Sequence, residues 1–132
     1  MEKVRKRLVR EKAVIAVYQY LLTDSTTEEL ETYLNNFYKP RMDDREVAAC
    51  KKMVFETIER IDEFKTKIEP HLKKGWTMDR LSYMEAAILY VAVYELDEMS
   101  KEIVAHEAVE LTKKYCDDKS YKFINGVIAA ID

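Results

Sequence analysis

The scarcity of chain-turning residues constrains this sequence more than any other feature, since its 132 residues include only two glycines and two prolines. Strand-rich folds need many tight turns, and glycine and proline supply the backbone conformations for those turns. So few of them favour long helices joined by short loops. The length fits one domain over residues 1–132, and a domain of this size buries about two-thirds of its unfolded surface.

Helical periodicity runs through most of the chain. A first helix is predicted over residues 3–22, where apolar residues recur every three or four positions. The segment from Tyr83 to about Asp97 is apolar on all sides, which is typical of a central buried helix. A further helix is predicted over about 101–115, and the pattern as a whole indicates an all-α, compact domain of six to seven helices.

Sequence signals for helix ends divide the rest of the chain. Three capping boxes mark helix starts: Thr26 with Glu29, Asp43 with Glu46, and Ser82 with Glu85. The helix after Thr26 is predicted to end near Tyr38, and the helix after Asp43 to run until Pro70 ends or kinks it. A cap at Asp117 or Asp118 is expected to start the last helix, which reaches about Ile131.

Charge is unevenly distributed along the chain. The net charge is −3, but residues 1–12 hold six bases and two acids, a net +4 that leaves −7 for the remainder. Cations near a helix N-terminus oppose the helix macrodipole, so these bases cost local stability unless an anion compensates them. A basic end on an acidic body favours a localised anion site over indiscriminate nucleic-acid binding. The alternative is a solvated helix start that serves only solubility.

Patterns for catalysis and metal binding are weak. The sequence has no glycine-rich phosphate loop, HExxH motif or nucleophile elbow, so we predict neither catalytic residues nor a cofactor. The paired carboxylates at 43–44 and 117–118 stand at predicted helix starts, where they are more often caps than acid–base pairs. His71 and His106 lack the spacing of metal ligands, so no metal is predicted.

The composition is that of an ordinary cytosolic protein, with 48% apolar and 36% charged residues. No run of about 18 apolar residues is present, and the N-terminus lacks the apolar segment of a secretory signal. Cys50 and Cys116 are expected to be reduced thiols in or near the core. We therefore expect a cytoplasmic protein without membrane contact.

The segment 116–131 contains a second feature that favours a nucleic-acid site, after the basic N-terminal stretch. Lys119, Lys122 and Phe123 cluster near a predicted helix start. Phe123 is either a core residue, the default for a helical phenylalanine, or a platform on which a base stacks. Gly126 interrupts an apolar helix at a cost of about 1 kcal/mol relative to alanine, and a close approach of two helices is its expected reason.

Three blocks of sequence carry motifs that recur together in one family. The first is RLVREKAVIAVYQ (7–19), the second is WTMDRLSYMEAAILYVAVYEL (76–96), and the third is IVAHEAVELTKKY (103–115) followed by KSYKFINGVIAAI (119–131). Through an arginine-containing first helix, a Trp, Asp-Arg-Leu and Tyr-Glu-Leu run, and Glu-Ala-Val-Glu-Leu and Lys-Phe-x-Asn-Gly-Val signatures, the chain resembles the NusB family. The resemblance covers nearly the whole chain, although residues 25–57 carry almost no signature.

The resemblance implies an all-α fold of two packed three-helix bundles and a non-catalytic role in transcription antitermination. It implies binding to boxA-type single-stranded RNA of ribosomal RNA operon leaders, as a heterodimer with the small-subunit ribosomal protein NusE. Through this complex the protein would act indirectly on the RNA polymerase elongation complex. A homodimer that hides the RNA-binding face also fits the family, and a protein-interaction module that binds no RNA is the alternative function.

Carried over position by position, the resemblance implies a set of RNA contacts. Lys119 stands where the family often has an acidic residue, so this extra base is expected to strengthen RNA binding or to change the preferred sequence. Glu85 also has a purely structural explanation, because it is the acceptor half of its own capping box. The full set of implied contacts is Lys6, Arg7, Arg10, His71, Glu85, Lys119, Lys122 and Phe123.

Overall fold

The structure is a computed structural model that describes residues 4–38 and 41–131. These residues form seven α-helices and three short turns of other helical types. The α-helices are α1 (Lys6–Thr23), α2 (Thr27–Tyr33), α3 (Asp44–Glu59), α4 (Ile61–Ile68), α5 (Tyr83–Glu95), α6 (Lys101–Tyr115) and α7 (Ser120–Ala130). The short turns are the π-helical η1 (Leu34–Tyr38) and the 3₁₀-helical η3 (Glu69–His71) and η4 (Met78–Arg80).

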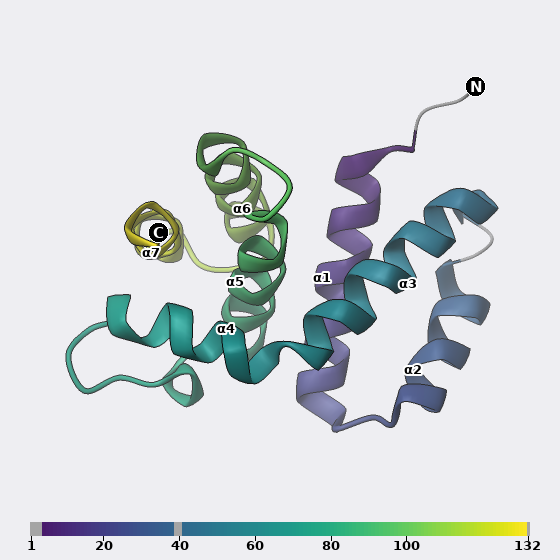
Figure 1. Cartoon of the computed structure of the whole chain (residues 1–132), viewed down its shortest axis with the longest axis horizontal. Coiled ribbons are helices and arrows are strands. Elements are labelled where there is room, and N and C mark those ends of the chain that lie inside the picture. Colours follow the sequence, from purple (N-terminus) through teal and green to yellow (C-terminus); the bar gives the residue numbers. More distant parts are fainter. Residues whose placement is uncertain (1–3, 39–40, 132) are drawn as a thin grey trace.

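The helices form two groups that meet along α1. Helices α1, α2 and α3 form one group, and α4 to α7 form the other (Figure 1). Helix α1 packs against α3 within its own group and against α5 of the other. The all-α fold with two sub-bundles is therefore confirmed, and the second sub-bundle contains four helices because α4 packs against α5.

Helix α5 is the centre of the core. Every residue from Ala86 to Glu95 is buried, because α1, α3, α4, α6 and α7 all pack around this helix. The sequence predicted this burial from the absence of a polar face. No helix in residues 4–38 and 41–131 has both the length and the apolar character that crossing a membrane would require.

The three capping boxes predicted from the sequence are all present. Thr26, Asp43 and Ser82 each accept a hydrogen bond from the backbone N–H three residues on. The glutamate at that third position accepts in turn from the backbone of the cap. These reciprocal bonds satisfy N–H groups that have no partner within the helix.

The single long helix expected between Asp43 and Pro70 is wrong, because the chain breaks at Arg60. Arg60 has φ −106° and ψ 16°, outside the helical region. Its guanidinium donates to Glu63 and to Asp97, which follows α5, and lies 4.8 Å from the ring centre of Phe64. The break lets α3 pack against α1 while α4 packs against α5, so tertiary contacts override local helix propensity.

Two expectations for α7 are also wrong. The residue before the helix is Lys119, and its side chain makes no capping hydrogen bond. Asp117 instead accepts from the Lys119 backbone N–H and from the Ser120 hydroxyl, both at 3.1 Å. Gly126 makes no close helix contact, since a Cβ built on it would meet nothing within 4 Å.

Candidate nucleic-acid interface

The basic start of α1 is held by carboxylates from other parts of the chain. Arg5 donates to Glu46 of α3 from its backbone N–H at 2.9 Å, from Nε at 2.8 Å and from Nη2 at 2.7 Å. These hydrogen bonds from the Arg5 side chain and backbone lower the pKa of Glu46 to about 2. Arg5 therefore fastens the start of α1 to the start of α3.

Arg10 lies inside the protein, between α1, α5 and α6. Its Nε and Nη2 donate to the two carboxylate oxygens of Glu95 at 2.5 and 2.9 Å, and its Nη1 donates to Glu107 at 3.0 Å. The Arg10 side chain is only 6% exposed. Arg10 therefore links the two sub-bundles through ion pairs. Its burial does not fit a direct contact with an RNA phosphate.

Arg7 meets the same glutamate from the solvent side. Its Nε and Nη2 donate to the two oxygens of Glu107 at 2.8 and 3.1 Å, yet its side chain is 78% exposed. The hydrogen bond and the charge of Glu107 raise the pKa of Arg7 above its ordinary value. Arg7 is thus a permanently charged, exposed guanidinium in a defined position.

The compensating anions expected at the start of α1 are therefore the protein's own carboxylates. Glu46 compensates Arg5, and Glu107 compensates Arg7 and Arg10. Lys6 is exposed at the first position of α1. The remaining charged residues of the +4 stretch include Glu2 and Lys3, which lie outside the described residues.

The start of α7 is joined directly to the start of α5. Glu85 completes its capping box through Oε1 and accepts from the Ser120 hydroxyl through Oε2 at 2.8 Å. Lys119 and Lys122 are exposed at this end of α7. Phe123 is half-buried and packs against the core. The structural explanation of Glu85 is thus confirmed, and the same carboxylate also aligns two helix starts among exposed lysines.

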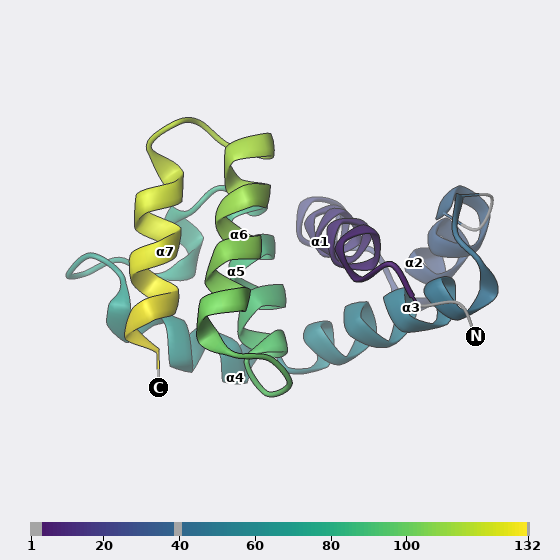
Figure 2. The ribbon, with the colours of Figure 1, turned by 90° about the horizontal axis from the view of Figure 1, so that it is seen from above.

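Helix α6 lies between the two basic regions. Figure 2 shows α6 between α7 and α1, and the ion pairs of α1 with Glu107 and Lys114 agree with that arrangement. Hydrogen bonds and ion pairs within the described residues link Arg7 with Arg10 through Glu107, and Glu85 with the α7 start. They do not join these two groups to each other. Because α6 lies between α1 and α7, an RNA strand that contacted both Lys6 and Lys122 would have to cross α6.

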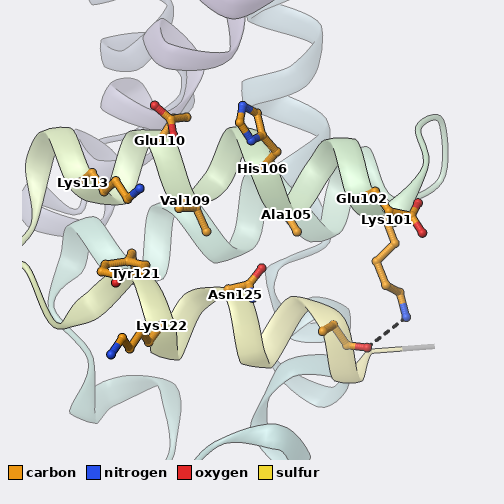
Figure 3. Close-up of a pocket in the computed structure, with 11 residues that line it drawn as sticks. Lys101, Glu102, Ala105, His106, Val109, Glu110, Lys113, Tyr121, Lys122 and Asn125 are labelled. Carbon is orange, nitrogen blue, oxygen red and sulfur yellow. Dashed lines mark hydrogen bonds between the residues drawn. The ribbon is translucent and has the colours of Figure 1, made fainter.

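A groove of about 740 Å³ runs between α6 and α7. Ala105 and Val109 line it from α6, while Tyr121 and Lys122 line it from α7 (Figure 3). The Lys113 ammonium lies 5.0 Å from the centre of the Tyr121 ring, a cation–π distance. Basic side chains and an aromatic ring thus border the groove near the start of α7, a combination suited to single-stranded RNA.

His71 lies on a separate connection, at the end of η3, where it is exposed. This connection is held in shape because Glu69 accepts from the Met78 backbone N–H at 2.8 Å and Met78 is buried. Within it the Arg80 guanidinium lies 5.0 Å from the centre of the Trp76 ring. The connection therefore presents charged and aromatic groups on a fixed backbone.

Tyr83 is a candidate contact that the sequence analysis missed. It is 52% exposed in the first turn of α5, two residues before Glu85. An exposed aromatic ring at the start of α5 is a candidate platform for base stacking. The available signal was an aromatic residue directly after the predicted cap at Ser82, where a helix's first turn is normally exposed.

Burial governs the chemistry of both thiols. It raises the pKa of Cys50 to about 12 and that of Cys116 to about 11. The thiolate is the nucleophilic form of cysteine, so both side chains stay protonated and unreactive near neutral pH.

The sequence matches the model of the NusB family over residues 7–132. Transcription antitermination protein NusB of Lysinibacillus sphaericus is 36% identical over 96% of this chain and 95% of that protein. The protein of that name in Listeria welshimeri is 35% identical over 97% and 96% of the two chains.

Solved structures give the same result. A crystal structure of the antitermination factors NusB and NusE in complex with dsRNA contains a chain with 30% identity and a TM-score of 0.82. That match covers 95% of this chain and 93% of the other. T. maritima NusB has 26% identity and a TM-score of 0.85, with 97% of this chain and 90% of the other covered.

Proposed function

Because this chain belongs to the NusB family, we propose that it is a non-catalytic transcription antitermination factor that binds RNA. The RNA is proposed to be a boxA-type single strand from ribosomal RNA operon leaders. The protein partner is proposed to be NusE, and RNA polymerase is reached indirectly through the assembled complex. These events take place in the cytoplasm, where transcription occurs.

The observation that carries this proposal is the likeness to a NusB chain that was crystallised with NusE and dsRNA. A second related chain comes from a crystal structure of a plectonemic RNA supercoil, with 33% identity and a TM-score of 0.83. Both relatives were crystallised with RNA, and their folds align with nearly all of this chain. RNA binding is therefore the function that best fits the exposed lysine and arginine side chains described above.

The chain's own residues suggest how the RNA is held. Lys6 and Arg7 on α1 would neutralise phosphates on one side of α6, and Lys119 and Lys122 at the start of α7 would do so on the other. Phe123 is half-buried, so only part of its ring is available to a base. We propose that unpaired bases stack near the α7 start while the lysines fix the backbone.

Arg10 and Glu85 are proposed to act on RNA indirectly, and His71 directly. Arg10 supports Glu107 from inside the protein and would act on RNA only through its neighbours. Glu85 has one carboxylate oxygen on its own cap and the other on Ser120, so its main effect would be to position the α7 start. His71 is exposed and keeps its proposed role as a direct contact.

The decisive experiment is a titration of fluorescein-labelled RNA, followed by fluorescence anisotropy at several salt concentrations. A boxA-containing single strand, a scrambled single strand and a duplex would each be titrated with and without NusE. We expect the boxA strand to bind most tightly and NusE to increase its affinity. If no RNA bound at low salt under either condition while NusE still bound, the protein-interaction module would replace this proposal.

Variants locate the binding surface. Each phosphate contact to a single strand contributes about 0.7 to the slope of log affinity against log salt, so Lys6→Ala with Arg7→Ala should reduce the slope by about 1.4. Lys122→Ala should reduce it by about 0.7. Lys52→Ala, at an exposed position on α3, is the matched control and should change neither affinity nor slope.

A further inference from the structure

The Glu107 carboxylate is shared by two arginines that lie in very different surroundings. Arg10 donates to Oε1 at 3.0 Å from the buried side, and Arg7 donates to Oε1 at 2.8 Å and to Oε2 at 3.1 Å from the solvent side. The side chains of Arg10 and Glu107 are 6% and 10% exposed, whereas that of Arg7 is 78% exposed. Glu107 is thus fixed from within and in turn holds an otherwise exposed side chain.

The contact leaves one edge of Arg7 available. A guanidinium has five N–H donors in a rigid plane, and Glu107 uses the edge formed by Nε and Nη2. The second edge, formed by Nη1 and the other hydrogen of Nη2, matches the spacing of two phosphate oxygens. Arg7 can therefore bind a phosphate without releasing Glu107.

Arg10 limits the electrostatic cost of this arrangement. A lone carboxylate next to Arg7 would repel an approaching phosphate. The Arg10 guanidinium donates to Glu107 and also pairs with Glu95. The two arginines and two glutamates together carry no net charge, and an incoming phosphate meets the exposed member of this group first.

We infer that Glu107 is a positioning residue that pre-orients Arg7, with one guanidinium edge turned to an RNA phosphate. This inference rests on the proposed RNA binding. An unrestrained arginine loses rotamer freedom when it binds, and a side chain that is already held loses less. Glu107 stabilises the complex by ordering Arg7 beforehand and does not touch the RNA.

The test is a double-mutant cycle on RNA affinity, measured with the labelled boxA single strand in the presence of NusE. Glu107→Gln should weaken binding about two- to tenfold, the value of ordering one long side chain. The same substitution in an Arg7→Ala background should have no further effect. Glu102→Gln, at an exposed position on α6 in the same groove as Lys6 and Arg7, controls for the loss of a negative charge and should not weaken binding.

Arg7→Lys tests whether binding uses both edges of the guanidinium. The position is exposed, so the substitution should not affect folding. Lysine keeps the charge but lacks the planar fork, so affinity should fall below that of the wild type, though less than in Arg7→Ala, while the salt dependence is retained. Circular dichroism of each variant, with affinities referred to the folded fraction, separates positioning from a loss of structure.

Several results would overturn the inference. Tighter binding by Glu107→Gln would mean that Glu107 competes with phosphate for Arg7. Unchanged binding by Glu107→Gln, or wild-type affinity in Arg7→Lys, would remove the positioning role while leaving RNA binding intact. A wild-type protein that binds no RNA would refute the proposed function itself, and the inference with it.

Discussion

Replacing Arg10 by alanine should destabilise the protein far more than replacing Arg7, although both arginines contact Glu107. The side chains of Arg10 and Glu95 are 6% and 7% exposed, so alanine leaves the Glu95 carboxylate buried without its guanidinium. Removing one partner of a buried ion pair costs about 3–5 kcal/mol. The Arg7 side chain is 78% exposed, and Glu107 keeps its bond from Arg10 when Arg7 is lost, so stability should change little.

The predicted loss is a large fraction of the total stability. Domains unfold with a free energy of about 5–15 kcal/mol, so a loss of about 3–5 kcal/mol lowers the melting temperature by roughly 10–20 °C. Urea unfolding followed by far-ultraviolet circular dichroism measures the free energy directly. RNA binding by Arg10→Ala would fall only through its neighbours, because Glu107 loses its buried partner, whereas Arg7→Ala would remove a proposed phosphate contact itself.

A double variant separates the buried charge from simple loss of packing. Arg10→Ala combined with Glu95→Gln removes the unpaired carboxylate, and Glu107 keeps Arg7. We expect the double variant to be more stable than Arg10→Ala alone. A loss below about 1 kcal/mol for Arg10→Ala, or an equal loss for Arg7→Ala, would refute the reasoning from burial.

Three further outcomes follow from the described contacts. Gly126→Ala should raise the free energy of unfolding by about 0.5–1 kcal/mol in urea, because a Cβ fits there in open space. Glu46 has its pKa lowered from 4.5 to about 2 by Arg5, so its stabilisation is present above pH 4.5 and is lost as the pH falls towards 2. Glu46→Gln should lower stability near neutral pH and flatten that acid loss, which unfolding curves at several pH values would detect. Tyr83→Ala should weaken RNA binding by about 1–3 kcal/mol with the fold intact, whereas Leu22→Ala, at another exposed apolar position, should not affect binding.

Local sequence rules predicted the three helix starts that have capping boxes, and the central helix. A capping box depends on residues three positions apart, and an all-apolar helix depends on consecutive residues, so both are visible in the sequence. The break at Arg60 depends on Asp97 and on packing of the two sub-bundles against α1 and α5. No local pattern of glycine or proline marks it. The role expected for Gly126 failed for the same reason, since helix contact is a property of the fold.

The candidate site shows the same division between local and non-local information. The resemblance placed Arg7 and Arg10 together on the first helix, three positions apart. Which of them is exposed depends on Glu95 and Glu107, about 85 and 97–100 residues further along the chain. The sequence therefore placed both arginines in one basic helix start and assigned the same role to an exposed arginine and a buried one.

The capping glutamates explain why a structural role and a functional one are hard to separate by sequence. A carboxylate has about four acceptor sites, and a capping box uses only one of them. Glu46 uses its remaining capacity on Arg5, 41 residues away, and Glu85 uses it on Ser120, 35 residues away. Each of these two boxes thus starts its own helix and also fixes the start of a second one, α1 or α7. The basic side chains proposed to hold RNA lie at the starts of α1 and α7. The residues that stabilise the fold therefore also position the proposed RNA-binding surface.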